Sequence, residues 1–189
     1  MNTTIDLLAL LRNHLRTHDT EYPEVEKAYQ EAVQSLKTAL KPDTIPLLDV
    51  YITAQDDRIT ACLRFLFWQG LHLNEACFRD PIQKHFLNQD FEDICQEGIL
   101  NSLSEAVRAY DYGWQLYLSL TDAEKAQAEP ITEYHCHLET AGYKLAHYWG
   151  FRYGDELLSK VVPGYVPDLA VTVAYRRMVL DFLEFDPEA

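Results

Sequence analysis

Apolar residues recur at intervals of three and four along most of the chain, a spacing that places side chains on one face of an α-helix. Leu8, Leu11 and Leu15 show this spacing near the amino terminus, and Leu36 and Leu40 show it further on. Only residues 161–175 are rich in β-branched side chains, and prolines interrupt that stretch. The pattern therefore predicts an all-α fold.

Capping and turn residues divide the pattern into six or seven helices. Thr44 caps one segment with Pro46 in its first turn, and a capping box at Ser102 and Glu105 divides or bends another. The predicted helices are residues 4–16, 20–40 and 44–74, a short segment from 80, a segment from 90 that residues 98–104 interrupt, 131–149 after Pro130, and 167–185.

The segment of about residues 44–74 is predicted to lie at the centre of the fold. Around residues 65–68 (Phe-Leu-Phe-Trp) it is apolar on every side, and a helix without a polar face is typical of a protein interior. No linker and no internal repeat divides the chain. We therefore expect a single helical domain over residues 1–189, built as an irregular bundle around this central helix.

The size and charge of the chain narrow the classes of partner. The 189 residues are 48% hydrophobic, as in an ordinary globular domain. Thirty acidic against sixteen basic residues give a net charge of -14, which opposes binding to nucleic acid or to an anionic membrane surface. The same charge would attract a basic protein. The sequence contains no uncharged apolar run of about 18 residues, the length that a membrane span requires.

The cysteines and the amino terminus indicate a cytoplasmic protein. Cys62, Cys77, Cys95 and Cys136 are widely spaced and form no C-x-x-C pair, so we expect buried thiols rather than a disulfide framework. Polar residues interrupt the apolar positions of the first twenty residues, unlike the apolar centre of a signal peptide.

Residues 133–139 are predicted to be helical and carry two glutamates and two histidines at every second position, in the order Glu, His, His, Glu. Adjacent turns pair His135 with Glu139 and Glu133 with His137. His135 and His137 point roughly 160° apart on a helix, so they cannot hold one metal ion, and no metal site is predicted. Two interpretations stay open for His135 and Glu139: structural hydrogen bonding beside the apolar stripe, or a ligand pocket.

A second group of polar residues accompanies the central helix. Gln55 occupies the apolar stripe between Ile52 and Ile59, where a buried amide needs either an internal hydrogen-bond partner or a ligand. Polar and aromatic residues also mix near the end of this helix, a common place for pockets. The candidate ligand-pocket residues are therefore Gln55, Trp68, His72, Glu75, His135 and Glu139.

Aromatic residues are frequent, with twelve tyrosines in the chain. Tyr110, Trp114 and Tyr117 share one helix face, and we expect them in the core. Tyr112 and Tyr153 are then left for the surface, where tyrosine suits a protein interface.

The sequence contains no phosphate-binding glycine loop, nucleophile elbow or dinucleotide-binding fingerprint. No catalytic residue is therefore predicted, and the sequence leaves the identity of any cofactor unknown. The first hypothesis is a non-catalytic cytoplasmic interaction protein with an acidic surface, which binds a basic protein or a second copy of itself as a homodimer. The alternative is a helical enzyme that binds a small molecule or metal in a pocket between helices.

Overall fold

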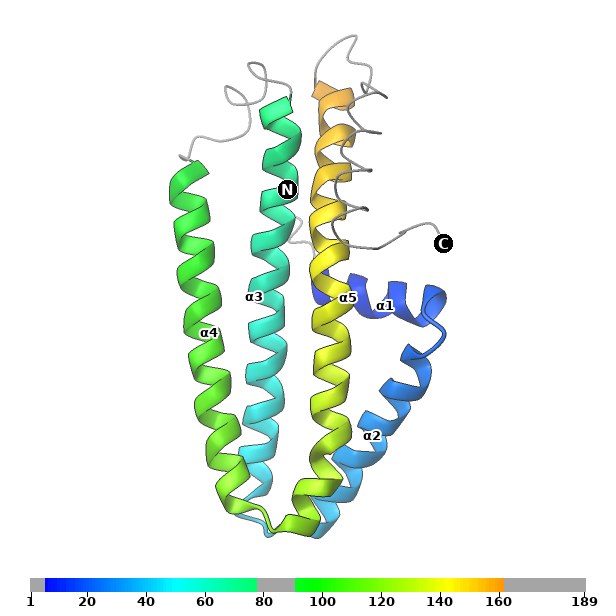
Figure 1. Cartoon of the computed structure of the whole chain (residues 1–189), viewed down its shortest axis with the longest axis vertical. Helices are drawn as coiled ribbons and strands as arrows, with labels where there is room; N and C mark the ends of the chain where they lie inside the picture. Colours follow the sequence, from blue (N-terminus) through cyan, green and yellow to red (C-terminus); the bar gives the residue numbers. More distant parts are fainter. Residues whose placement is uncertain (1–5, 78–90, 162–189) are drawn as a thin grey trace. The chain divides into compact units, whose positions relative to one another are not determined.

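The computed structural model describes residues 6–77 and 91–161, and all regular structure in these ranges is helical (Figure 1). The predicted all-α class is thus confirmed for this part of the chain. None of its helices is long and apolar enough to cross a bilayer. The helices are α1 (Leu7–His18), α2 (Tyr22–Ala39), α3 (Ile45–Cys77), α4 (Phe91–Ser119) and α5 (Asp122–Val161).

Five helices occur in the described ranges, whereas six or seven were predicted for the whole chain. The predicted breaks near Gly98 and before Ile131 are wrong, because α4 continues through the first and α5 contains Pro130. Gly98 packs instead against the Phe65 ring, and Ile131 is buried beside the proline. Tertiary packing here outweighs local helix-breaking tendencies. The predicted segments from 80 and over 167–185 lie outside the described residues.

The chain divides into two compact units. Unit 1 comprises Met1–Cys62 and Ile99–Gly142, and unit 2 comprises Leu63–Gly98 and Tyr143–Ala189. Each of α3, α4 and α5 contributes one part of its length to each unit. A single domain over residues 1–189 stays a prediction.

Four helices of unit 1 share an apolar core. The side chains of Leu36 in α2 and Leu48 in α3 are fully buried, and Ile131 in α5 is almost fully buried. Complete burial of such a side chain contributes about 1.5–3 kcal/mol. The buried members of the cluster are Ala32, Leu36, Leu40, Leu48, Leu116, Leu120 and Ile131.

Helix α1 adds an amphipathic element to unit 1. Its start is capped by Asp6, whose Oδ1 accepts a hydrogen bond of 3.0 Å from the backbone N–H of Ala9. One face of the helix is buried and the other carries polar side chains, as the spacing predicts. The buried residues are Leu7, Leu8, Leu11 and Leu15.

Two glycines mark close approaches of different kinds. In unit 2, a Cβ atom on Gly150 of α5 would overlap the backbone carbonyl of Phe67 in α3. In unit 1, a Cβ atom on Gly113 of α4 would lie 3.1 Å from the ring of Tyr51 in α3. A side chain can move by a few tenths of an ångström, whereas a helix backbone cannot move without disturbing its own packing.

These contacts predict unequal effects of alanine substitution. Gly150→Ala is expected to lower the free energy of unfolding by about 2 kcal/mol or more, although alanine favours the helix by up to about 1 kcal/mol. Gly113→Ala is expected to change it by less than about 1 kcal/mol, because Tyr51 can shift. Urea unfolding of the two variants measures the difference, and equal losses would contradict the account.

Candidate functional site

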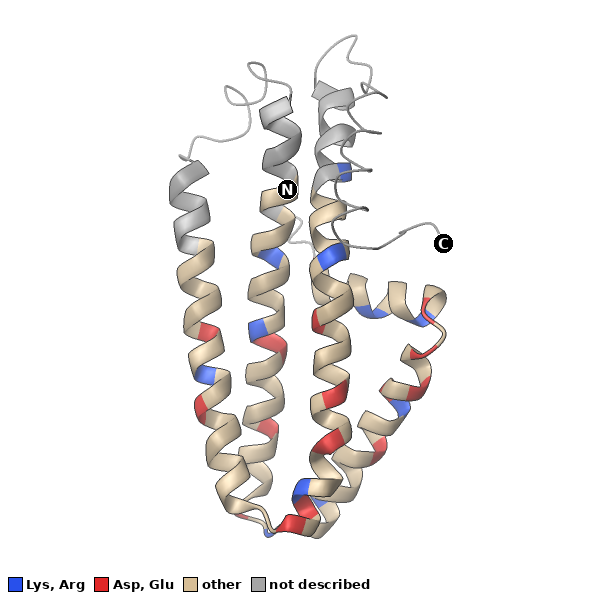
Figure 2. Cartoon of the chain, viewed as in Figure 1, with Lys and Arg blue, Asp and Glu red and all other residues tan. Residues whose placement is uncertain are grey.

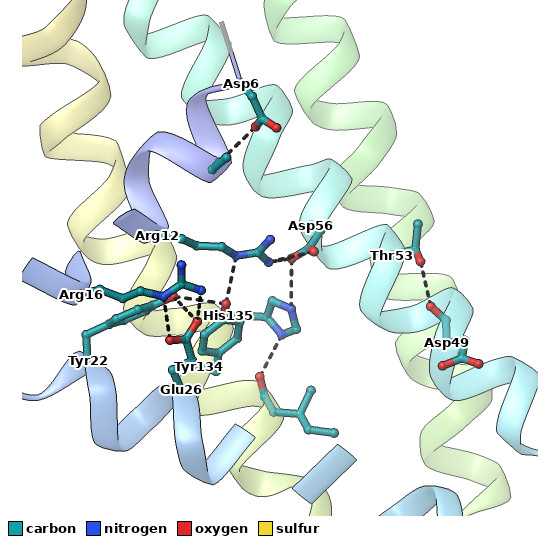
Figure 3. Close-up of polar contacts among 12 residues, drawn as sticks. Asp6, Arg12, Arg16, Tyr22, Glu26, Asp49, Thr53, Asp56, Tyr134 and His135 are labelled. Carbon is teal, nitrogen blue, oxygen red and sulfur yellow. Dashed lines mark hydrogen bonds and ion pairs between the residues drawn. The ribbon is translucent and has the colours of Figure 1, made fainter. Parts of the chain in front are cut away.

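A network of charged and hydroxyl groups connects the helices of unit 1 (Figure 3). At its centre, Arg12 of α1 donates from Nη2 to both carboxylate oxygens of Asp56 in α3, at 2.8 and 2.9 Å. Its Nε donates to the Tyr134 hydroxyl of α5 at 3.0 Å. Because both charged side chains are about three-quarters buried, these bonds fix the three helices more firmly than exposed ion pairs would.

The electrostatics keep both partners charged. Burial alone would raise the pKa of Asp56, but its interactions with His135 and Arg12 lower that pKa below the ordinary value. Burial opposes the charge on Arg12 as well, yet Asp56 raises the pKa of the guanidinium. The pair is therefore an ionised contact and stores no transferable proton near neutral pH.

The network continues to α2 through two tyrosine hydroxyls. Tyr22 Oη lies 3.3 Å from Tyr134 Oη and donates to Glu26 at 3.3 Å. Since the Tyr22 hydrogen points to Glu26, Tyr134 donates to Tyr22. Arg16 completes this series of hydrogen bonds by donating to the two carboxylate oxygens of Glu26 at 2.9 and 2.7 Å. Burial raises the pKa of Tyr22, so its hydroxyl stays neutral.

His135 is a buried histidine beside this network, with 3% of its side chain exposed. Its Nδ1 lies 2.8 Å from the Ile131 carbonyl oxygen and therefore carries the hydrogen. Its Nε2 lies 3.6 Å from Asp56 Oδ1, which is an electrostatic contact too long for a hydrogen bond. The rings of Tyr29 and Tyr51 meet the imidazole edge-on. The structural interpretation of His135 is consistent with this surrounding.

Arg58 brings together two other predicted pocket residues. It donates to both carboxylate oxygens of Glu139 at 2.8 and 2.7 Å, and its Nε donates to Gln55 Oε1 at 3.0 Å. Gln55 thus has an internal hydrogen-bond partner, one of the two roles considered for it. The side chains of Trp68, His72 and Glu75 lie outside the described residues, and so does that of Tyr153.

Asp19 attaches the connection between α1 and α2 to α5. One of its oxygens lies 2.7 Å from His137 Nε2, and the other accepts from the backbone N–H groups of Glu21 and Tyr22. Burial opposes the charge of Asp19, but His137 and the two backbone donors lower its pKa. His137 thus forms this long-range bond, a partner that spacing on one helix could not predict.

The described residues contain no group of three or more histidine, cysteine, aspartate or glutamate side chains arranged to hold a metal ion. Cys62 and Cys136 are free thiols, and the prediction that they are buried is wrong, because Cys62 is only partly buried and Cys136 is exposed. The polar side chains of the network around Arg12 instead bind one another across helices. The network is therefore suited to holding helices together.

The second candidate is an apolar surface on the unit 1 part of α4. Eight large apolar side chains there are between 45% and 69% exposed, and we call this surface the outer face of α4. The rings of Trp114 and Tyr117 stack with centroids 5.7 Å apart, and Lys125 Nζ lies 4.2 Å from the Tyr117 ring centre. The outer face comprises Ile99, Leu100, Leu103, Val107, Tyr110, Trp114, Tyr117 and Leu118.

The prediction that Tyr110, Trp114 and Tyr117 belong to the core is wrong, because each is at least half exposed. The buried side of α4 is a different seam, about 120° around the helix from these three residues, where Ala109 and Leu116 are buried. The small residues Ala109 and Gly113 on this side allow α4 to approach its neighbours closely. Small residues four positions apart are the sequence signal that could have identified the core side.

Tyr112 is partly buried and lies on the polar side of α4, about 170° from the centre of the outer face by helical spacing. Its role in an interface therefore stays a prediction, separate from the exposed aromatic residues.

Few charges accompany the outer face. Residues 99–119 contain only Glu105, Arg108 and Asp111 as charged residues, which Figure 2 shows as three coloured bands on α4. Arg108 forms ion pairs with Asp57 of α3 and with Glu105. The acidic character of the chain is thus absent from this surface.

Comparisons of the chain with protein-family models, curated proteins and solved structures find no match.

Adjacent aspartates test whether the network carries stability. Asp56→Asn removes the charge that compensates Arg12 in a largely buried setting, and we expect it to cost about 2–3 kcal/mol of unfolding free energy. Asp57→Asn removes an ion pair whose two side chains are nearly half exposed, and we expect a change of about 0.5 kcal/mol. Urea unfolding at pH 7 measures both. Similar values for the two variants would show that the Arg12 network has no special weight.

The lowered carboxylate pKa values predict acid sensitivity. Hydrogen bonding from Arg16 lowers the pKa of Glu26, and the pKa values of Asp19 and Asp56 are lowered as described above. Because each pKa is lower in the folded state, the unfolded chain binds more protons in acid. Stability present at pH 7 is therefore lost as the pH falls below about 4.

Urea midpoints measured from pH 7 to acid test this expectation. The wild-type midpoint should fall, and that of Asp56→Asn should fall less, because one of the contributing carboxylates is gone. Parallel pH profiles for the two proteins would contradict a contribution from Asp56.

Proposed function

We propose that this chain is a non-catalytic interaction protein that binds a protein partner through the outer face of α4. The observation that carries the proposal is the size of this apolar surface. Its eight large apolar side chains are each 45% to 69% exposed on one helix, whereas a typical monomer exposes contiguous apolar patches of only about 300–600 Å² at most. Patches above that range are typical of interaction sites.

The composition of the outer face also supports binding. Tyrosine and tryptophan dominate the energy of many interfaces, and three such residues occupy one half of this surface. The stacking of Trp114 on Tyr117 and the position of Lys125 over the Tyr117 ring restrict these side chains before binding. Restricted side chains lose less conformational entropy when a partner covers them.

The distribution of charge distinguishes the two partners considered, a basic protein and a second copy of the chain. A basic protein is attracted by the net charge of -14, but residues 99–119, which carry the outer face, have a net charge of only -1, from two carboxylates and one guanidinium. A basic partner would therefore bind elsewhere on the acidic surface, and an apolar partner suits the outer face. A homodimer belongs to the second kind. The cytoplasmic location and the single bundle around residues 44–74 remain parts of this proposal.

The alternative of a ligand-binding enzyme has weaker support. Among its candidate residues, Gln55 and Glu139 bind Arg58, and His135 binds the Ile131 carbonyl. A ligand at these side chains would have to replace internal hydrogen bonds, which lowers its net gain in free energy.

A capture experiment with matched variants tests the proposal. Leu103→Glu places a charge at the middle of the outer face, and Val50→Glu places the same charge on an exposed apolar position of α3. From a lysate of the cells that make the protein, tagged wild type and Val50→Glu should retain a protein, a native copy of the chain included. Leu103→Glu should retain at least tenfold less.

Repeating the capture at several salt concentrations distinguishes an apolar from a charged binding surface. Capture through an apolar surface should persist at high salt, because screening affects charges rather than apolar contacts. Equal capture by wild type and Leu103→Glu would show that the outer face is not the binding surface. Capture that is lost with salt and unaffected by Leu103→Glu would assign binding to the acidic surface instead.

A further inference from the structure

The outer face of α4 carries a regular seam. Six of its eight residues are separated by three and four positions in alternation, the heptad pattern with which two helices pack side by side. Apolar residues scattered on a surface would not show this regular spacing. The seam consists of Leu100, Leu103, Val107, Tyr110, Trp114 and Tyr117.

The two halves of the seam differ in side-chain volume. The first half is aliphatic, from Leu100 to Val107, and the second is aromatic, from Tyr110 to Tyr117. A helix that packs well against this seam must offer large side chains to the first half and smaller ones to the second, because facing positions fill space best when large and small alternate.

The same seam in antiparallel orientation meets this requirement. With the two helices reversed, Leu100 faces Tyr117 of the second copy, Leu103 faces Trp114, and Val107 faces Tyr110. Every layer then pairs one aliphatic with one aromatic side chain. A parallel arrangement would put like against like, with three layers of paired aromatics and three of paired aliphatics.

From this match we infer that the partner of the outer face is a second copy of the chain, bound antiparallel through α4. The inference rests on the proposed function, because it names the occupant of the same surface. It goes beyond that function in fixing the partner, the orientation and the register.

Charge and area agree with a second copy. Two chains of net charge -14 repel each other, and residues 99–119, with a net charge of -1, are where they can meet with little opposition. A standard interface buries roughly 800 Å² of each partner, and the outer face offers eight large apolar side chains, each 45% to 69% exposed, toward that area.

Sedimentation equilibrium of four full-length proteins tests the inference. Wild type and Val50→Glu should be dimers, and added salt should not dissociate them, since it screens the repulsion between the acidic chains. Leu103→Glu and Trp114→Lys should each raise the dissociation constant at least tenfold, because each buries charges in two layers of its homodimer. Circular dichroism checks that both variants remain helical.

Mixing Leu103→Glu with Trp114→Lys tests the orientation. In an antiparallel pair, the glutamate introduced at position 103 of one chain faces the lysine introduced at position 114 of the other. The second such layer keeps its native leucine and tryptophan. The mixture should therefore form a heterodimer more stable than either homodimer. Because one of its charged layers is paired and the other is native, the antiparallel heterodimer should have a dissociation constant near that of the wild type. In a parallel pair, position 103 faces position 103, so the heterodimer would bury one unpaired charge in each of two layers. Its dissociation constant would then stay at least tenfold above that of the wild type, and the antiparallel register would be wrong.

The remaining outcomes separate this inference from the proposed function. A wild-type chain that stays monomeric at high concentration overturns the second copy. If capture still depends on Leu103, the proposed function stands with a different partner. If the monomer instead loses stability to urea on Leu103→Glu, a segment of the same chain covers the face, and both proposals are wrong.

Discussion

The arginine at position 12 imposes the main constraint on unit 1. A guanidinium that is largely buried must receive acceptors for its hydrogens, and Arg12 obtains them from Asp56 of α3 and Tyr134 of α5. Tyr134 in turn donates to Tyr22 of α2. One charge on α1 therefore sets how three other helices lie against it, and a shift of any of them would leave a buried polar group without a partner.

Helix α4 stands outside this network and is held differently. It contributes Leu116 to the apolar core, Gly113 to the contact with Tyr51, and Arg108 to an ion pair with α3. The outer face lies on a different side of α4 from these contacts. The division explains the proposed function in physical terms: the polar groups of unit 1 bind one another internally, whereas the outer face still has apolar surface to bury.

The sequence predicts those features that depend on neighbouring residues. The helical class follows from apolar spacing, the starts of α1 and α3 lie within a few residues of their predicted positions, and the buried state of His135 follows from its place beside the apolar stripe of α5. Contacts between distant residues are beyond such reasoning. Arg12 and Asp56 are 44 positions apart, and no local pattern connects them.

The mistaken predictions have the same origin. Gly98 and Pro130 weaken a helix locally, yet packing against Phe65 and the burial of Ile131 keep α4 and α5 continuous. On α4, both seams are apolar, and large aromatic residues suggest a core more strongly than alanine and glycine do. The structure reverses that preference, because only the small residues permit close helix packing.

The central claim is that the outer face of α4 is a surface that a second copy covers. Its most direct test is the urea midpoint of the wild-type chain at concentrations that differ about a hundredfold, since association stabilises the folded state by mass action. The account predicts a midpoint that rises with concentration in the wild type and stays constant in Leu103→Glu. A wild-type midpoint that is independent of concentration over this range would contradict it.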